Sequence, residues 1–246
     1  MKKLFDICYS TKSQQCLDIY LPSEDIFPVF VYFHGGGLAS GDKADQKNIF
    51  EYLATTGIAV VSVNYRMYPE TQYPNFLKDA AEAVSWVYKN INNYGRISGI
   101  FVGGSSAGGY LTQMLCFDKS WLGKYDLSPM DFSGFIHDAG QPTCHFNVLR
   151  ERKQDSRRVI VDHTAPLYHV GEDESYPPML IIVSNNDMQN RYEQTLLLVS
   201  TLKHFGHTEN VQLKIMNGSH CEYVFTVDEN GENIFGQLVR QYILGK

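Results

Sequence analysis

The sequence predicts an α/β fold with a mostly parallel central sheet and helices on its faces. Short apolar segments alternate along the chain with amphipathic segments of helical spacing, the pattern of strands joined by crossover helices. Several apolar segments, such as IAVVSVNY at 58–65 and MLIIV at 179–183, are nearly continuous. Strands buried on both faces of a parallel sheet have this composition. No repeat, low-complexity tract or linker separates the segments, so we expect one domain over residues 1–246.

The predicted strands and helices follow one another in a regular order. Each predicted strand is a short run rich in apolar residues; the runs are 16–21, 28–33, 58–65, 97–102, 132–137, 179–183 and 211–216. Each predicted helix carries apolar residues three or four positions apart, as Leu77, Ala81 and Val84 do within 75–91. The other helices are expected at 44–56, 107–116, 192–205 and 234–244.

One segment, 141–178, does not fit this alternation. It is long and polar between two predicted strands, and it shows only short helical pieces. Loops of this length in compact domains are usually functional or disordered. We therefore expect residues 141–178 to form a small cap or lid insertion that faces the substrate.

Composition and charge exclude several classes of protein. The chain is 43% hydrophobic and 20% charged, as in ordinary globular proteins, which excludes disordered, collagenous and long coiled-coil chains. Its 21 Lys and Arg against 27 Asp and Glu give a net charge of −6, so we expect no nucleic-acid partner. No run approaches about 18 apolar residues, and the first residues do not resemble a secretory signal. We therefore expect no membrane partner and a cytoplasmic location.

The cysteines indicate a reducing compartment. The five of them form no C-x-x-C pair and their number is odd, unlike a disulfide framework or a zinc site. We expect reduced thiols, no metal and no cofactor. For Cys221, which follows His220, the sequence leaves two interpretations open: a thiol whose oxidation affects activity, or a buried and inert thiol.

The first chemical motif is G-x-S-x-G, which reads Gly104-Ser105-Ser106-Ala107-Gly108. It follows a predicted strand directly and opens a predicted helix. A serine on such a sharp strand-to-helix turn needs small neighbours, and the turn exposes its hydroxyl group at a helix N-terminus, where developing negative charge is stabilised. The alternative is an ordinary Gly/Ser turn. The context favours Ser106 as a nucleophile.

The second motif is His34-Gly35-Gly36-Gly37, directly after a predicted strand. Consecutive glycines are tolerated where the backbone turns tightly and points N–H groups at a ligand. An oxyanion hole needs such groups, and Gly35, Gly36 and the residue after the nucleophile, Ala107, would supply them. A phosphate-binding turn is the alternative, but neither G-K-[ST] nor G-x-G-x-x-G is present. We expect His34 to anchor the loop.

Together these motifs resemble those of the α/β-hydrolase superfamily. HGGG followed about 70 residues later by GSSAGG is similar to the esterase/lipase group related to hormone-sensitive lipase and to bacterial carbohydrate and feruloyl esterases. The resemblance runs from about residue 17 to the C-terminus and implies an α/β-hydrolase fold. Many members of this group have Asp before the nucleophile, where this chain has Ser105, so local hydrogen bonding should differ.

The resemblance also implies the order of a catalytic triad, with Ser first, then an acid, then His. Asp187 follows the predicted strand 179–183, where the family carries its acid. Among the eight histidines, only His220 lies in a Gly-containing loop between the last predicted strand and the C-terminal helix. Ser106, Asp187 and His220 are therefore the predicted catalytic residues, with His220 as the base.

The insertion 141–178 is where substrate contacts are expected. His145 and Phe146, close after a strand end, are the predicted pocket residues. A cluster of basic residues follows, namely Arg150, Arg152, Lys153, Arg157 and Arg158, with acidic residues between them. These could contact an acidic or sugar substrate, but a solvated helix face of mixed charge is the favoured interpretation.

These features predict a serine carboxylesterase that acts on a small-molecule ester with a short acyl group, for example an acetyl ester of a carbohydrate. Two alternatives stay open within hydrolases: a feruloyl or aryl esterase, and an amide hydrolase similar to a formamidase. Outside enzymes, the alternative is a ligand-binding protein on a hydrolase fold. The sequence leaves the oligomeric state open.

Overall fold

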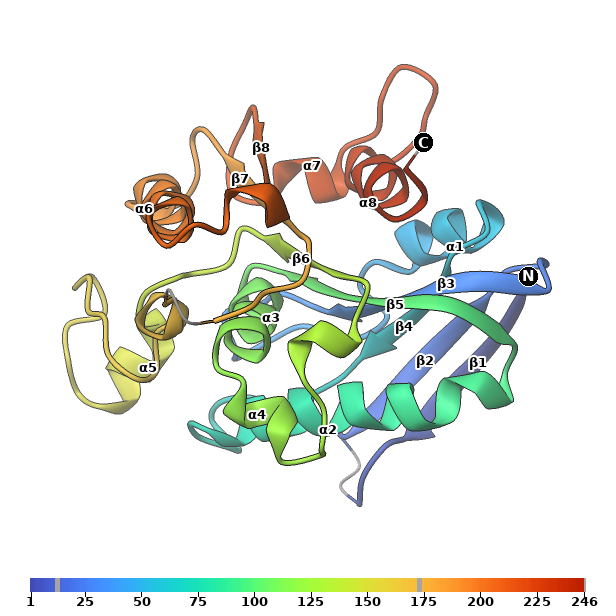
Figure 1. The fold of residues 1–246 in the computed structure, drawn as a ribbon, viewed down its shortest axis with the longest axis horizontal. Helices are drawn as coiled ribbons and strands as arrows, with labels where there is room; N and C mark the ends of the chain where they lie inside the picture. The colour runs from blue at the N-terminus through green and yellow to red at the C-terminus, as the bar shows by residue number, and fades with distance from the viewer. Residues whose placement is uncertain (12–13, 172–173, 246) are drawn as a thin grey trace.

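A computed structural model describes residues 1–11, 14–171 and 174–245 of the chain (Figure 1). Its centre is an eight-stranded sheet within these residues, in the order β1-β2-β4-β3-β5-β6-β7-β8. The strands are β1 Lys2–Cys8, β2 Cys16–Leu21, β3 Ile26–Phe33, β4 Ala59–Val63, β5 Arg96–Ser105, β6 Gly134–Asp138, β7 Met179–Ser184 and β8 Val211–Met216. The strands β4, β3, β5, β6, β7 and β8 pair in parallel, whereas β1 and β2 are antiparallel to their neighbours.

The strands predicted from the sequence are all present, with ends that differ by up to three residues. The sequence missed β1, since its side chains are mostly exposed and its apolar pattern is correspondingly weak. Crossover helices cause the parallel order, because each one returns the chain to the same edge of the sheet. The carboxyl ends of β3, β5, β6 and β7 therefore lie at one edge, which is where motif residues follow the strands.

The helices cover both faces of the sheet. They are α1 Lys47–Thr55, α2 Asn75–Asn90, α3 Ala107–Phe117, α4 Ser120–Gly123, α5 Phe146–Glu151, α6 Arg191–His204, α7 Glu222–Phe225 and α8 Ile234–Leu244. Short 3₁₀ turns add η1 Ile91–Asn93, η2 Pro129–Asp131, η3 Pro166–His169 and η4 Thr208–Asn210. Figure 1 shows α2 and α3 on one side of the sheet and α1 and α8 on the other.

One predicted helix begins later than expected. The sequence indicates a helix from residue 44, but α1 begins at Lys47. Asp42 accepts a hydrogen bond from the Ala44 N–H, and Asp45 accepts one from the Asp42 N–H. Such local side-chain hydrogen bonds compete with helix formation and delay the first turn.

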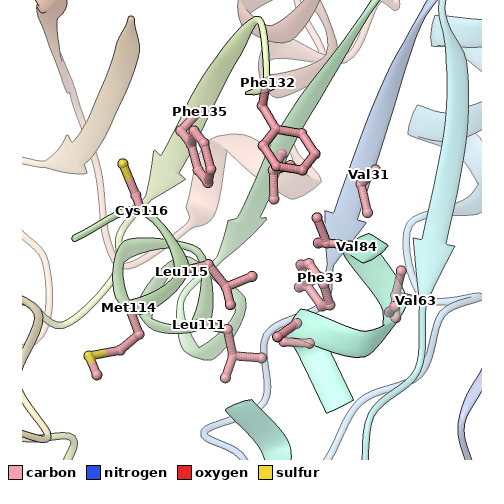
Figure 2. Close-up of a cluster of buried hydrophobic side chains, with 14 of the residues drawn as sticks. Val31, Phe33, Val63, Val84, Leu111, Met114, Leu115, Cys116, Phe132 and Phe135 are labelled. Carbon is pink, nitrogen blue, oxygen red and sulfur yellow. The ribbon is translucent and has the colours of Figure 1, made fainter. Parts of the chain in front are cut away.

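Two apolar layers hold the sheet between its helices. On the first face, Val31, Phe33 and Val63 point toward Val84 of α2 and Leu111 of α3, as Figure 2 shows. On the second face, side chains of the same strands pack against α1 and α8. The alternation of buried side chains along β3 explains this arrangement, since successive residues of a strand point to opposite faces.

The insertion between β6 and β7 contains two short helices, α5 and η3, and no strand among its described residues. It extends from the sheet beside α6 (yellow in Figure 1). No helix in the described part of the chain is long and apolar enough to cross a membrane.

The packing on the first face gives a direct prediction of stability. Leu111 is fully buried between α3 and the sheet. We expect Leu111→Ala to lower the free energy of unfolding by about 2–5 kcal/mol, because lost apolar contact and a residual cavity add. Leu197→Ala on α6 is the matched control, because Leu197 is 49% exposed. Denaturant titration should separate the two variants; equal small losses would contradict this packing.

Candidate active site

Ser106 lies on a strained turn between β5 and α3. Its φ of 56° and ψ of −110° belong to a region that residues other than glycine rarely adopt. The Ser106 N–H donates to the Asp138 carbonyl oxygen at 2.7 Å, and its own carbonyl accepts from the Tyr110 N–H at 3.0 Å. These bonds hold the backbone so that the side chain projects from the helix N-terminus.

The glycines of this turn are required by close backbone contact. A Cβ atom on Gly108 would lie 2.0 Å from the Phe33 carbonyl oxygen, and one on Gly104 would lie 2.6 Å from the same atom. Both contacts are with backbone, which cannot move aside without disturbing β3. The G-x-S-x-G spacing therefore lets the serine turn pack directly against the end of β3.

Two side chains from later strand ends form a hydrogen-bonded chain with Ser106. His220, in the loop after β8, places Nε2 2.8 Å from Ser106 Oγ. Its Nδ1 lies 2.5 Å from Oδ1 of Asp187, in the loop after β7. The Asp187 side chain is buried, while 23% of the His220 side chain is exposed. The three residues named from the sequence are thus brought together in one hydrogen-bonded chain.

The Asp187 carboxylate is fixed by its own loop. Oδ1 accepts a hydrogen bond from the Met188 N–H at 2.7 Å, and Oδ2 accepts from the Ser184 N–H at 3.4 Å. Ser184 Oγ in turn donates to the Ser219 carbonyl at 2.7 Å, which ties the acid loop to the histidine loop. An aspartate held in this way can fix one tautomer of the histidine, with Nδ1 carrying the proton.

The glycine loop after β3 lies against Ser106. A Cβ atom on Gly35 would lie 3.4 Å from Ser106 Cβ. Gly36 and Gly37 have φ values of 101° and 65°, which explains why glycine occupies both positions. In the described part of the chain, the N–H groups of Gly35, Gly36 and Ala107 donate to no protein acceptor. They are therefore free to bind an acceptor that is not part of the protein.

His34 has a structural position in this loop, as expected. Its ring stacks on Tyr65 with centroids 4.5 Å apart, and Nδ1 donates to the Gly35 carbonyl at 2.8 Å. The Tyr65 hydroxyl donates to the His34 carbonyl at 2.9 Å. Burial lowers the pKa of His34, so its ring is neutral. It holds the backbone of the loop and makes no contact with the Ser106 side chain.

A buried acid behind the serine turn was not found from the sequence. Asp138, at the end of β6, accepts a hydrogen bond from the Tyr223 hydroxyl, and burial raises its pKa to about 6. Hydrogen bonds from Ser105 and Tyr223 partly offset this effect. Ser105 also accepts a hydrogen bond from the Tyr32 hydroxyl at 3.0 Å. The position of Asp138 directly after a predicted strand was the available signal.

Cys221 is buried next to His220, with Sγ 3.7 Å from Nε2. Burial raises the pKa of its thiol well above the ordinary value, so the thiolate is suppressed at neutral pH. This favours the second of the two interpretations of Cys221, a buried and inert thiol.

The two pocket residues predicted in the insertion have different environments. Phe146 lines a cavity and approaches the glycine loop: a Cβ atom on Gly37 would lie 3.1 Å from its ring. His145 is only 2% exposed, and its Nδ1 accepts from the Asn147 N–H as the N-cap of α5. Its ring stacks on Phe146 at 4.3 Å, so it supports the cavity wall from behind.

The arginines of the insertion agree with the solvated face of mixed charge that the sequence favoured, since Arg150, Arg157 and Arg158 are exposed and Arg157 pairs with Asp155. Arg150, Arg157 and Arg158 line the same cavity as Phe146. Of these three, only Arg150 lies on α5, which ends at Glu151; Arg157 and Arg158 follow in a loop. Arg152 pairs with an acidic side chain, since its Nη1 lies 2.7 Å from Asp162 Oδ2.

Known proteins resemble this chain in sequence and in structure. The BD-FAE family model matches residues 17–120. Kynurenine formamidase of Danio rerio is 31% identical over 135 residues, which are 54% of this chain and 44% of that protein. Probable carboxylesterase 1 of Arabidopsis thaliana is 29% identical over 154 residues, 53% of this chain and 47% of that protein.

Among solved structures, a truncated carbohydrate esterase from gut microbiota superposes with a TM-score of 0.81 at 18% identity, covering all of this chain and 96% of that one. The expected α/β-hydrolase fold is confirmed by the sheet order and by this likeness. The chain matches less than half the length of the two curated relatives named above.

The buried acid Asp138 gives a prediction of pH dependence. The pKa of Asp138 is about 6 in the folded protein against 3.8 ordinarily, so the folded state retains this proton while the unfolded chain has released it. Between pH 4 and 6 this group therefore makes the fold less stable as pH rises. Asp138→Asn cannot titrate but keeps an oxygen acceptor for Tyr223.

We compare the free energy of unfolding of Asp138→Asn with that of the wild type. The difference, variant minus wild type, should increase by up to about 3 kcal/mol from pH 4 to pH 7. Chemical denaturation across this range measures the difference, with Asp25→Asn on an exposed bend as the matched control. A constant difference between Asp138→Asn and the wild type would contradict the raised pKa.

Proposed function

We propose that this protein is a serine carboxylesterase in which Ser106, His220 and Asp187 form the catalytic triad. The observation that carries the proposal is the continuous chain from Ser106 Oγ through both ring nitrogens of His220 to the buried Asp187, with distances of 2.8 and 2.5 Å. Relatives named as carboxylesterases support the same reaction.

The proposed reaction has two halves. Ser106 Oγ attacks the ester carbonyl carbon while His220 Nε2 takes its proton, and Asp187 stabilises the imidazolium ion. The carbonyl oxygen becomes an oxyanion that accepts hydrogen bonds from the N–H groups of Gly35, Gly36 and Ala107. The tetrahedral intermediate then expels the alcohol, which takes the proton from His220, and leaves an acyl group on Ser106.

Water completes the cycle. His220 removes a proton from a water molecule as the water oxygen attacks the acyl carbon, and a second oxyanion forms in the same position. Collapse of this intermediate breaks the bond to Ser106 Oγ, which regains a proton from His220 and releases the carboxylic acid. No step requires a metal ion or a cofactor, because the nucleophile, base and oxyanion donors are all protein groups.

The substrate is proposed to be a small ester with a short acyl group, such as an acetyl ester of a carbohydrate. Phe146 lies against Gly37 of the glycine loop, so its ring limits the space on one side of Ser106. A solved structure similar to this one is described as a carbohydrate esterase.

A second candidate is hydrolysis of an amide. The relative from Danio rerio is named kynurenine formamidase, and it is 31% identical over 135 residues. The same triad and oxyanion donors could cleave a formyl amide, with His220 protonating the leaving nitrogen. Activity on an aryl formamide that exceeds activity on the matching aryl acetate would favour this candidate.

Replacement of the nucleophile tests the proposed reaction. We expect Ser106→Ala to lower kcat for 4-nitrophenyl acetate by at least about 10⁴-fold, because the acyl-enzyme cannot form. A fluorophosphonate probe should label the wild type on Ser106 and leave Ser106→Ala unlabelled. A melting temperature close to that of the wild type is the control for folding. Full activity in Ser106→Ala would overturn the proposal, and an unlabelled wild type would favour a ligand-binding protein.

A series of acyl lengths tests the proposed substrate class. We expect kcat/KM for 4-nitrophenyl esters to fall by about tenfold or more between acetate and octanoate, because Phe146 restricts the space beside the glycine loop. Phe146→Ala should reduce this difference, while Phe225→Ala, at an exposed position on α7, serves as the matched control. Equal rates for all chain lengths would contradict a short-acyl preference.

A further inference from the structure

A cavity of about 360 Å³ lies between the insertion and the N-terminus of α6. Four arginines contribute to its wall, namely Arg150, Arg157, Arg158 and Arg191, and its lining contains no aspartate or glutamate. This composition is unusual for a chain with a net charge of −6. The cavity is large enough to hold part of a small-molecule ligand.

The cavity adjoins the candidate catalytic residues. Met188 in its wall directly follows Asp187, and Phe146 in its wall contacts the glycine loop at Gly37. Asn147, next to Phe146, donates from Nδ2 to the Gly37 carbonyl at 2.5 Å. The cavity therefore lies beside both the acid loop and the glycine loop, and Ser106 itself is not among its lining residues.

Two of the exposed arginines have no carboxylate partner in the described part of the chain. Arg150 donates from Nη1 to the amide oxygen of Asn147 at 2.9 Å, and its guanidinium group lies 5.1 Å from the Phe146 ring centroid. Arg158 forms no ion pair with any described residue. Arg157 differs, because it pairs with Asp155 at 2.6 Å.

Arg191 places a further positive charge inside the cavity wall. It is only 4% exposed, and its guanidinium group donates to the Ala139 carbonyl at 2.5 Å and to Gln141 Oε1 at 3.2 Å. Both acceptors are neutral. Arg191 is also the first residue of α6, whose N-terminal dipole adds positive potential at the same place.

The nearby acidic side chains are occupied elsewhere. Glu151 accepts hydrogen bonds from the Tyr68 hydroxyl and from the Tyr73 N–H. Asp162 accepts from Arg152, from the Thr164 backbone and from its hydroxyl group. Asp187 lies near enough to Arg191 to stabilise its charge, and Arg157 pairs with Asp155, so among the described residues Arg150 and Arg158 are the cavity arginines left without an acidic partner.

We propose that this cavity is an anion-binding subsite, and that the ester cleaved at Ser106 carries a carboxylate or phosphate group bound by Arg150 and Arg158. The proposal rests on the serine esterase reaction and names the substrate class of that site. Arginine suits this role because its planar guanidinium group binds either oxyanion through two parallel hydrogen bonds. The buried Arg191 stabilises the bound charge from behind the wall.

Acetyl or acyl esters of similar structure, one anionic and one neutral, test the proposal. On the alcohol side, 3-acetoxybenzoate and 3-acetoxyphenyl phosphate are compared with the neutral methyl 3-acetoxybenzoate. On the acyl side, 4-nitrophenyl hydrogen adipate is compared with its methyl ester. We expect kcat/KM for an anionic ester of at least one pair to exceed that of the neutral ester roughly tenfold, as for a charge-assisted hydrogen bond. The preferred pair identifies the side and the anion.

Variants of the arginines locate the effect. The double variant Arg150→Gln/Arg158→Gln should lower kcat/KM for the preferred anionic ester roughly tenfold more than for its neutral partner. Arg96→Gln, at the opposite end of β5, is the matched control and should leave this ratio unchanged. Added salt should reduce the preference of the wild type. An equal effect of the double variant on both esters would overturn the proposal.

A binding measurement separates this proposal from the proposed reaction. Ser106→Ala cannot turn the ester over, so calorimetry reports binding of the anionic and the neutral ester directly. Ser106→Ala should bind the anionic ester more tightly than the neutral ester, and the triple variant that adds Arg150→Gln and Arg158→Gln should lose this difference. This result supports the subsite even if the wild type hydrolyses neither ester. Equal binding of both esters rejects the subsite even if the wild type is an active esterase.

Discussion

The parallel pairing of β3 with β5 is the contact on which the rest of the site depends. Phe33 at the end of β3 pairs with Gly104 at the end of β5, so the loops that follow both strands begin side by side. One loop carries the glycine run and the other carries Ser106. The Phe33 carbonyl oxygen lies so close to Gly104 and Gly108 that no side chain fits at either position. Loss of this contact would separate the glycine loop from the turn that carries Ser106.

Polar groups buried behind this contact stabilise the turn. The strained backbone of Ser106 is held by the Asp138 carbonyl, while the Asp138 side chain is held by Tyr223. Tyr223 follows His220 in the chain, so the same short segment supplies both a contact to the Ser106 hydroxyl and a support for its backbone. Strained residues persist only where the surrounding structure fixes them in this way. The fold therefore couples the position of His220 to the conformation of the serine turn.

Much of this arrangement was predictable from the sequence, because local patterns determine it. The two glycine motifs and the continuous apolar strands each need only neighbouring residues to be recognised. Asp187 and His220 were identified through the resemblance to α/β-hydrolases, which places the acid and the histidine in the loops after the last two strands. The register of β3 and β5 was not predictable, since it depends on contacts between residues about 70 positions apart. Asp138 was missed for the same reason: its role arises from a hydrogen bond to Tyr223, far along the chain. The arginines are exposed, as the sequence favoured, but their position around one cavity depends on the loop after α5 and on α6, which local patterns do not reveal.

The central claim is that Ser106 becomes acylated during turnover. Rapid quenching of the wild type with excess 4-nitrophenyl acetate, followed by peptide mass spectrometry, measures this directly. The account predicts one added acetyl group on the peptide that contains Ser106, formed in a burst of 4-nitrophenol release and absent from Ser106→Ala. Steady hydrolysis without an acetylated serine, or acetylation at another residue with the same kinetics, would contradict it.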